Sequence, residues 1–532
     1  MSLAERAGEL FMIGFPGTEP EDVPESLIRE EGVGGVILFA RNLRSPDQVR
    51  RLIAHIQSLG AAPSPRLAHP DGPVAGLPLL IATDQEGGIV LRFTATPWPG
   101  AMALGAAADP DLTRRVSAGI ARELRAMGIN MNLAPVLDVN VNPANPVIGV
   151  RAFGSDPRLV AAHGAAYLTG HHEAGVLTTA KHFPGHGDTA VDSHHALAVV
   201  PHETERLEAV ELVPFRRAIA AGVDAIMTAH VFFPAVEAEP DTPATISPAV
   251  LTGLLRQKLG YDGLVITDCM EMKAIANGVG TVEGAVRAIA AGADLVLISH
   301  TADLQRAAIR AVREAIAEGR IPAERVEQAL RRVRAARERV ARMAGDHPSP
   351  DVAVVGCVEH QALAAEAAAA AVTAVGDLRD VLPPDPARTL LLAVEAAPVV
   401  VVEDRRDAAS PVLAAAAEQA LSLRAIGVSR DPGAQEISRL VAEAAGADVV
   451  LVATYLADRF PGQAALVRAL QAAGRIVVLI PQRGPYDLLA APGVRGAVIM
   501  YEDRRPAAGA ALRVLLGQAP ARGKLPVDLP GW

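Results

Sequence analysis

Residues 281–299 read TVEGAVRAIAAGADLVLIS and contain one helix–strand unit that recurs along the chain. In the first part, Thr281–Ala291, apolar residues follow the spacing of a helix. Gly292 comes next, and glycine commonly follows a helix because it adopts positive φ without strain. The second part, Asp294–Ser299, is a short apolar run typical of a buried strand. A helix that leads directly into a buried strand predicts an α/β fold.

The first 300 residues repeat this unit, with eight short apolar runs of β type and helical patterns between most of them. The runs are Leu10–Phe15, Gly35–Phe39, Leu79–Thr83, Asn130–Pro135, Val176–Ala180, Ala225–Ala229, Leu264–Thr267 and Asp294–Ser299. Alternating helices and buried strands predict a parallel sheet, and eight units in sequence predict a closed (β/α)8 barrel of the TIM type. An open doubly wound sheet is the alternative, because periodicity alone does not exclude it.

A breaker cluster at residues 345–350, GDHPSP, ends this pattern and predicts a linker. Apolar strand-like runs then restart, with Ala-rich helical patterns between them. The runs are Leu390–Val394, Asp448–Ala453, Ile476–Pro481 and Ala497–Tyr501. We therefore predict a catalytic barrel over residues 1–344, a linker over 345–352 and a smaller three-layer α/β/α sandwich domain over 353–532.

Composition narrows the classes of partner and compartment. The net charge of -10 argues against a nucleic-acid partner, which needs a clustered basic surface. The first ten residues read as the start of an amphipathic helix, and the apolar stretch Ala364–Val375 is too short to cross a membrane and reads as a helix. The two cysteines fit a reducing compartment. We expect a cytoplasmic protein with no membrane partner, and the sequence leaves its oligomeric state open.

Polar residues follow the predicted barrel strands at several of their carboxyl ends, where the active site of a parallel barrel forms. They are Asp84 and Arg92 after the third strand, Asp138 and Arg151 after the fourth, Lys181–His194 after the fifth, His230 after the sixth and Asp268 after the seventh. Directional donors and acceptors of this kind suit sugar hydroxyls, which are costly to bury unpaired. For each residue alone, one half of a surface ion pair is the favoured interpretation, so the argument rests on their convergence at one face of the barrel.

Asp268 directly follows the apolar run Leu264–Thr267. A carboxylate at the end of a buried strand is held rigidly, which suits an attacking group. The competing interpretation is an N-cap for the next helix, because aspartate is favoured at that position. The residue by itself does not decide between the two.

The segment Lys181–His194, KHFPGHGDTAVDSH, is a loop rich in histidine, aspartate, glycine and proline. Asp192 and His194 lie two residues apart, so a turn can hold the carboxylate against the ring and fix its tautomer for acid–base chemistry. A metal site is the competing hypothesis, with ligands from His182, His186, Asp188, His194 and His195. That spacing fits no standard zinc pattern, so we expect neither a metal nor a cofactor.

At this point the chain resembles glycoside hydrolase family 3, in particular its β-N-acetylglucosaminidase branch. The resemblance is carried by Asp84-Gln-Glu-Gly-Gly, Asn132–Asn140, Asn145–Gly154, Lys181–Thr189 with Asp192-Ser-His194, and Thr267–Met272. It implies that Asp268 is the nucleophile and that His194, paired with Asp192, is the acid/base. It also implies that the terminal sugar is bound by Asp84, Arg92, Arg151, Lys181 and His182.

The resemblance further implies retaining hydrolysis of terminal β-N-acetylglucosaminides, with cell-wall muropeptide fragments and peptidoglycan recycling as the expected context. Ile89 and Ala198 depart from the family pattern without touching a catalytic position. Phosphorolysis is the nearest rival reaction, because a neutral histidine does not repel phosphate as a carboxylate does. Three more distant rivals are a β-glucosidase of the same family, a metal-dependent hydrolase and a non-catalytic carbohydrate-binding protein.

Overall fold

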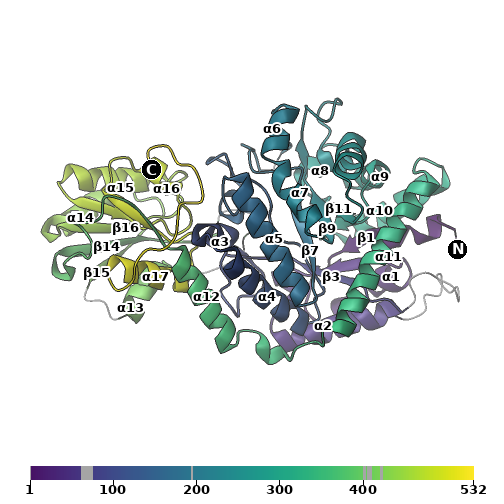
Figure 1. Ribbon diagram of the computed structural model, residues 1–532, viewed down its shortest axis with the longest axis horizontal. Helices are drawn as coiled ribbons and strands as arrows, with labels where there is room; N and C mark the ends of the chain where they lie inside the picture. The colour runs from purple at the N-terminus through teal and green to yellow at the C-terminus, as the bar shows by residue number, and fades with distance from the viewer. Residues whose placement is uncertain (1, 62–75, 193–195, 399–402, 404–409, 420–422) are drawn as a thin grey trace. The chain divides into compact units, whose positions relative to one another are not determined.

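The computed structural model describes residues 2–61, 76–192, 196–398, 403, 410–419 and 423–532 (Figure 1). Its chain divides into two compact units. The first unit consists of Met1–Gln85, Thr113–Ile148 and Val160–Cys357, and the second of Glu86–Leu112, Gly149–Leu159 and Val358–Trp532. Two segments from the predicted barrel range, Glu86–Leu112 and Gly149–Leu159, thus cluster with the carboxyl-terminal part of the chain. The boundaries predicted at residues 344 and 352 stay a prediction.

The first unit contains an eight-stranded parallel sheet. Its strands are β1 (Phe11–Ile13), β2 (Gly35–Ile37), β3 (Leu80–Thr83), β6 (Met131–Asn132), β7 (Leu177–Phe183), β9 (Ala225–Thr228), β11 (Leu264–Ile266) and β12 (Val296–Ile298). They follow the spatial order β11-β9-β7-β6-β3-β2-β1-β12. Each strand lies within one of the predicted runs or overlaps it, so the eight predicted strands are confirmed.

The sheet closes on itself between β11 and the residues that lead into β12. A parallel bridge joins Ile266 to Leu295, and the N–H of Thr267 donates to the C=O of Leu295 at 3.0 Å. A second bond runs from the N–H of Met270 to the C=O of Leu297 at 2.9 Å. The predicted barrel is therefore confirmed, and the open doubly wound sheet is wrong.

Helices connect the barrel strands and lie outside them (Figure 1). They are α1 (Glu25–Arg29), α2 (Pro46–Ala61), α4 (Pro110–Ala126), α5 (Pro157–Glu173), α6 (Thr204–Ala209), α7 (Leu212–Ala220), α8 (Lys273–Ala276), α9 (Thr281–Ala291), α10 (Ala302–Ala317) and α11 (Ala323–Asp346). The helical pattern over Glu203–Ala221 is two helices, with a break at Val210. Pro214 lies in the first turn of α7, where its missing N–H costs nothing, so the sequence favours a new helix start there.

The second unit is built on a six-stranded sheet with the order β13-β18-β17-β16-β14-β15. Its strands are β13 (Thr373–Gly376), β14 (Thr389–Val394), β15 (Arg424–Val428), β16 (Val449–Ala453), β17 (Ile476–Leu479) and β18 (Gly496–Ile499). Successive residues of β14 enter two different cores: Leu390 and Leu392 belong to one cluster, and Leu391 and Ala393 to the other. Side chains alternate across a strand, so both faces of this sheet are covered and the three-layer sandwich is confirmed.

Helices cover the two faces of this second sheet (Figure 1). They are α3 (Ala101–Ala107), α12 (Val358–Ala371), α13 (Pro411–Glu418), α14 (Ala434–Glu443), α15 (Pro461–Ala472), α16 (Asp487–Ala490) and α17 (Arg505–Leu515). The two edge strands, β13 and β15, are not predicted from the sequence. Thr373–Gly376 directly continues an Ala-rich helical pattern, and three of the five residues of β15 are exposed, so neither forms an apolar run of its own.

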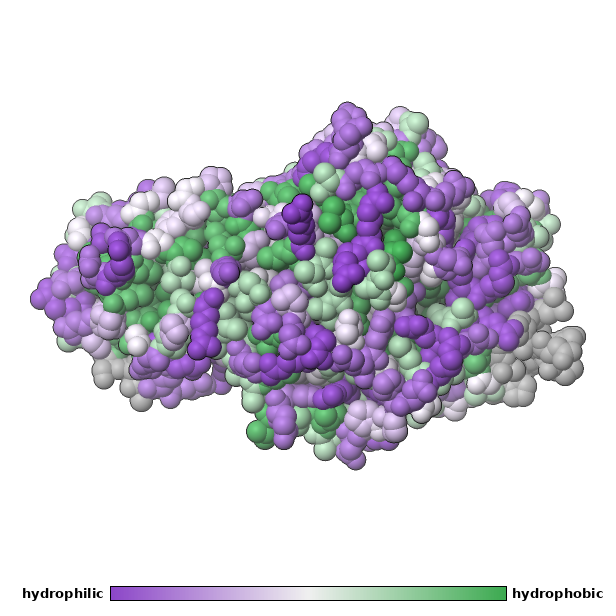
Figure 2. Space-filling model, viewed as in Figure 1, coloured by the Kyte–Doolittle hydropathy of each residue, from purple (hydrophilic) through white to green (hydrophobic). Residues whose placement is uncertain are grey.

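The apolar helical stretch that includes Ala364 is longer than the sequence predicts. Val352–Ala371 has the length and composition of a membrane-crossing helix, with a mean hydropathy of 1.2. The core helix of a soluble protein passes the same test. Within the second unit α12 packs against α3 and α17 and buries a face formed by Ala364, Ala367, Ala368 and Ala371. The face of the molecule in Figure 2 mixes hydrophilic and hydrophobic residues throughout.

Candidate active site

Asp268 lies just beyond β11, at the carboxyl end of the barrel. Its Oδ1 accepts the N–H of Cys269 at 2.7 Å, and the neighbouring Thr267 Oγ1 accepts the N–H of Leu297 at 3.0 Å. Asp268 is half-buried, whereas Thr267 and Cys269 are buried. The next helix, α8, begins at Lys273 after an N-cap at Met272. The interpretation of Asp268 as a helix N-cap is therefore wrong, and its carboxylate is held at a strand end.

His230 supports the main chain one residue beyond Asp268. This buried ring lies beyond β9, and its Nε2 is 3.0 Å from the C=O of Cys269. A carbonyl only accepts, so Nε2 carries the proton in this contact. The other ring nitrogen, Nδ1, lies 2.7 Å from Oγ1 of Thr245. The sequence places His230 at a strand end, but it gives no signal that the ring binds the backbone next to the candidate nucleophile.

Lys181 and Asp84 form an ion pair across the barrel end. Nζ of Lys181, on β7, is 2.8 Å from Oδ1 of Asp84, which follows β3. The Lys181 side chain is 2% exposed and that of Asp84 is 15% exposed. Two of the predicted sugar-binding residues are therefore brought together and fixed in orientation.

His182 is held by a fully buried carboxylate, Asp138. His182 Nδ1 lies 2.7 Å from Asp138 Oδ2, while the N–H groups of His182 and His186 donate to Oδ1 at 3.2 and 2.7 Å. Burial acts to raise the pKa of Asp138, but His182 and these hydrogen bonds outweigh it and the pKa is lowered. The ionised carboxylate only accepts, so His182 presents Nδ1–H to it, which fixes the ring orientation.

The rest of the histidine-rich loop is tied by local hydrogen bonds. Nδ2 of Asn145 donates to the C=O of His186 at 2.9 Å and of Gly187 at 3.1 Å. His186 Nδ1 lies 2.8 Å from Thr189 Oγ1, and Asp188 pairs with His202 at 2.5 Å. Within the described part of this loop, the ligands of the metal hypothesis thus face separate partners and no common centre.

The acid/base pair is described only in part. Asp192 is buried, with 8% exposure, and its C=O accepts the N–H of Ala196 at 3.2 Å. His194 and His195 lie outside the described residues. The Asp192–His194 pair therefore stays a prediction, and so does the contribution of these two histidines to a metal site.

The remaining two predicted sugar-binding residues belong to the second unit. Arg151 is buried and donates from Nε and Nη2 to the two carboxylate oxygens of Glu86, at 2.9 and 2.7 Å. This fork holds the guanidinium plane in one orientation. Arg92 follows β5 (Val90–Leu91) and is half-buried. Glu86 lies within the Asp84-Gln-Glu-Gly-Gly motif, but nothing in the sequence signals its pairing with Arg151.

Cys269 is a poor competitor for the role of nucleophile. Burial raises the pKa of its thiol to about 11, so the thiol stays protonated near neutrality. The thiolate is the reactive form of cysteine, and this environment disfavours it. Asp268 is accordingly the reactive candidate in the Thr267–Met272 segment.

A parallel barrel with carboxylates, a lysine and histidines at the carboxyl ends of its strands is typical of an enzyme, and comparison with known proteins identifies its class. Residues 2–336 match the model of the glycosyl hydrolase family 3 N-terminal domain. The chain belongs to glycosyl hydrolase family 3 and is a glycoside hydrolase. The predicted family and enzyme class are confirmed.

Two relatives and one more distant structure show what the chain is similar to. A family 3 β-N-acetylglucosaminidase from Paenibacillus sp. str. FPU-7 is 41% identical, with 99% of each chain covered and a TM-score of 0.90. Beta-hexosaminidase A from Pseudoalteromonas piscicida is 30% identical over 96% of this chain and 92% of its own. A β-glucoside phosphorylase is 21% identical, with coverage of 99% and 94% and a TM-score of 0.82, which shows a shared fold alone.

Proposed function

We propose that this glycoside hydrolase removes terminal, non-reducing β-N-acetylglucosamine residues with retention of configuration. The observation that supports this most directly is the 41% identity to the Paenibacillus β-N-acetylglucosaminidase over 99% of both chains. The hexosaminidase relative, which matches 96% of the chain, points to the same substrate class. Neither similarity depends on the barrel alone, since both extend through the second unit.

In the proposed first step Asp268 attacks the anomeric carbon and the bond to the leaving oxygen breaks. Protonated His194 transfers its proton to that oxygen, and a covalent glycosyl-enzyme forms on Asp268. In the second step neutral His194 takes a proton from water, whose oxygen attacks the same carbon and frees Asp268. Asp192 orients the ring and stabilises its charged form. The strand-end position of Asp268 and its bond to the Cys269 N–H fit a nucleophile that must not move.

Binding of the terminal sugar is proposed to use two preformed pairs. The Lys181–Asp84 pair offers an ammonium donor and a carboxylate acceptor, and Asp138 aims the ring of His182. Polar groups that are already held in place lose little entropy when they bind sugar hydroxyls. Arg92 and Arg151 are proposed to add further contacts, and the Glu86 fork keeps the Arg151 guanidinium in one plane. Cell-wall fragments as the natural substrate, and a cytoplasmic location, remain parts of the proposal.

Hydrolysis of 4-nitrophenyl N-acetyl-β-glucosaminide by wild type, Asp268→Asn and the exposed control Asp303→Asn tests this function. We expect turnover in wild type and in the control, with severe loss in Asp268→Asn. NMR of the first-formed product should show the β anomer. A preference for the β-glucoside would overturn the substrate assignment. Formation of sugar 1-phosphate in phosphate buffer would favour phosphorolysis over hydrolysis.

A further inference from the structure

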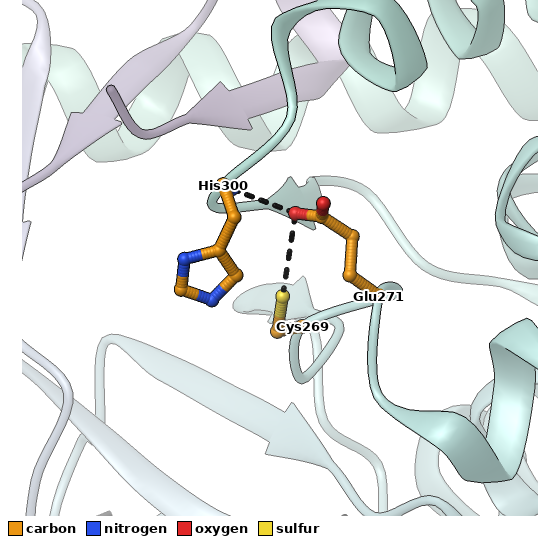
Figure 3. Close-up of side chains that lie close together, drawn as sticks. All are labelled: Cys269, Glu271 and His300. Carbon is orange, nitrogen blue, oxygen red and sulfur yellow. Dashed lines mark hydrogen bonds between the residues drawn. The ribbon is translucent and has the colours of Figure 1, made fainter. Parts of the chain in front are cut away.

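Three side chains with metal-binding atoms gather beside Asp268. Cys269 and Glu271 follow β11, and His300 follows β12, so the cluster lies where the barrel closes (Figure 3). One potential ligand atom from each residue lies within 4.8 Å of the other two. The set combines a thiol, a carboxylate and an imidazole, and none of its members belongs to the histidine-rich segment Lys181–His194.

The spacing of these atoms is close to what a tetrahedral metal centre requires. Cys269 Sγ is 4.0 Å from Glu271 Oε2. With Zn–S and Zn–O bonds of about 2.3 and 2.1 Å, a tetrahedral ion holds sulfur and oxygen about 3.6 Å apart. The observed pair is therefore within about half an ångström of that arrangement.

Main-chain contacts hold two of the ligands in place. Glu271 Oε2 accepts the N–H of His300 at 2.7 Å, so the carboxylate is anchored to the residue that supplies the imidazole. The peptide of Cys269 is fixed at both ends, by Asp268 Oδ1 on its N–H and by His230 on its C=O. His300 is exposed, so an ion reaches the cluster from the solvent side.

We propose that Cys269, Glu271 and His300 form a zinc-binding site, with water as the fourth ligand. Sulfur and imidazole ligands select zinc over calcium or magnesium, which prefer oxygen alone. As the Zn–S bond forms, the thiol proton of Cys269 passes to solvent. Three protein ligands and one open position are usual for an accessible zinc ion.

Zinc in this site inhibits hydrolysis, and this consequence rests on the proposed role of Asp268. The candidate nucleophile is adjacent to Cys269 in the chain, and its Oδ1 accepts the N–H of that residue. A divalent ion a few ångströms away attracts the carboxylate and lowers its reactivity toward the anomeric carbon.

Arg41 opposes zinc binding, so replacing it should change the zinc affinity in a known direction. Its Nη1 lies 3.0 Å from His300 Nδ1, and a guanidinium only donates, so this contact leaves the ring proton on Nε2. Zinc binding through Nε2 requires the other tautomer and the release of Arg41 from the ring. Arg41 also donates to the C=O groups of Phe15 and Ser299, at 3.1 and 2.6 Å, which can retain it.

Cobalt(II) serves as the spectroscopic probe, because thiolate ligation gives a near-ultraviolet charge-transfer band. We expect one equivalent of cobalt to produce this band in wild type and in the matched control Cys357→Ser, and the band to vanish in Cys269→Ser. Circular dichroism of each variant establishes that it is folded. No band in wild type, or an unchanged band in folded Cys269→Ser, would overturn the site.

The second test of the site is its zinc affinity, measured by competition with a chromophoric chelator. Glu271→Gln and the exposed-site variant His300→Gln should bind zinc at least about tenfold more weakly, and Arg41→Gln more tightly. Unchanged affinity in all three would overturn the ligand set. Zinc binding without inhibition of an active enzyme would overturn the coupling to Asp268. An enzyme that binds zinc but cleaves no glucosaminide would contradict the proposed function alone.

Discussion

Nζ of Lys181 lies 2.8 Å from Oδ1 of Asp84, although 97 residues separate them in the chain. The pair joins β7 to the segment after β3 within the first unit, and the lysine side chain is only 2% exposed. Two opposite charges placed this deeply stabilise each other, so removing either one costs the protein that stabilisation. This mutual dependence leads to the first prediction.

Lys181→Met should both destabilise the first unit and weaken substrate binding. Removing one partner of a buried ion pair typically costs about 3–5 kcal/mol, and the partial exposure of Asp84 favours the lower end. Denaturant unfolding measures the loss, with the exposed Lys273→Met as the matched control. If the unfolding free energy equals that of the control, removing Lys181 from the pair does not destabilise the protein by this amount.

Asp138→Asn should lower kcat/KM by about 10- to 100-fold, the scale found when the orientation of an active-site group is lost. The ionised carboxylate holds the ring of His182 at 2.7 Å and the N–H of His186 at 2.7 Å, and an amide matches only part of this arrangement. Steady-state kinetics on the nitrophenyl glucosaminide measure the effect. Wild-type kinetics in a folded variant would exclude an orienting role for Asp138.

His230 is predicted to be a positioning residue for the nucleophile. His230→Ala should lower kcat by about 10- to 100-fold with a smaller change in KM, because the lost contact is to the main chain next to Asp268. His230→Gln, which retains a donor toward the Cys269 carbonyl, should recover part of kcat. Equal activities of the two variants, or a change confined to KM, would contradict this role.

The stability of the second unit should fall as the pH rises from about 4 to 7. Burial raises the pKa of Asp487 from 3.8 to about 7, so the folded form holds a proton that the unfolded form releases. The contribution is complete below the unfolded pKa and is lost as the pH rises through the folded one, up to roughly 4 kcal/mol. Urea unfolding across this window should show the slope in wild type.

Asp487→Asn provides the comparison for that slope. The amide is neutral at every pH, so its unfolding free energy should vary less between pH 4 and 7 than that of wild type. Asp380→Asn, at a side chain that is 87% exposed, should retain the wild-type slope. If Asp487→Asn and wild type share one slope, the pH dependence arises elsewhere.

The barrel was predictable because buried parallel strands must be apolar on both faces, which leaves a strong signal in runs such as Leu264–Thr267. The signal weakens where a strand is not enclosed. β15 lies at a sheet edge and reads Arg-Ala-Ile-Gly-Val, with most of its residues exposed or half-exposed. The break between α6 and α7 has a local cause in Pro214, but the amphipathic pattern continues across it and predicts one helix.

In the candidate site, the sequence predicts several of the residues but not the partners they bind. Motifs and strand ends select Asp84, Lys181 and His182, and the structure pairs the first two. The partner of His182 is Asp138, 44 positions earlier, and that of Arg151 is Glu86, 65 positions earlier. Only three-dimensional register decides which carboxylate meets which cation. Two sequence signals point to Asp138: its position after a predicted strand and its place in the Asn132–Asn140 motif.

The contacts between β11 and Leu295 close the barrel next to Asp268. The position of this candidate nucleophile therefore depends on the completion of the barrel. β12 pairs on its other side with β1, so the strands at the two ends of the unit meet beside Asp268. A nascent chain that has not yet emerged past Leu297 leaves β11 as an open edge, with Thr267 and Met270 lacking the carbonyls they bind in the closed barrel. During synthesis, the main-chain contacts on either side of Asp268 therefore form last among the described barrel contacts, after β3 and β7 have been synthesised.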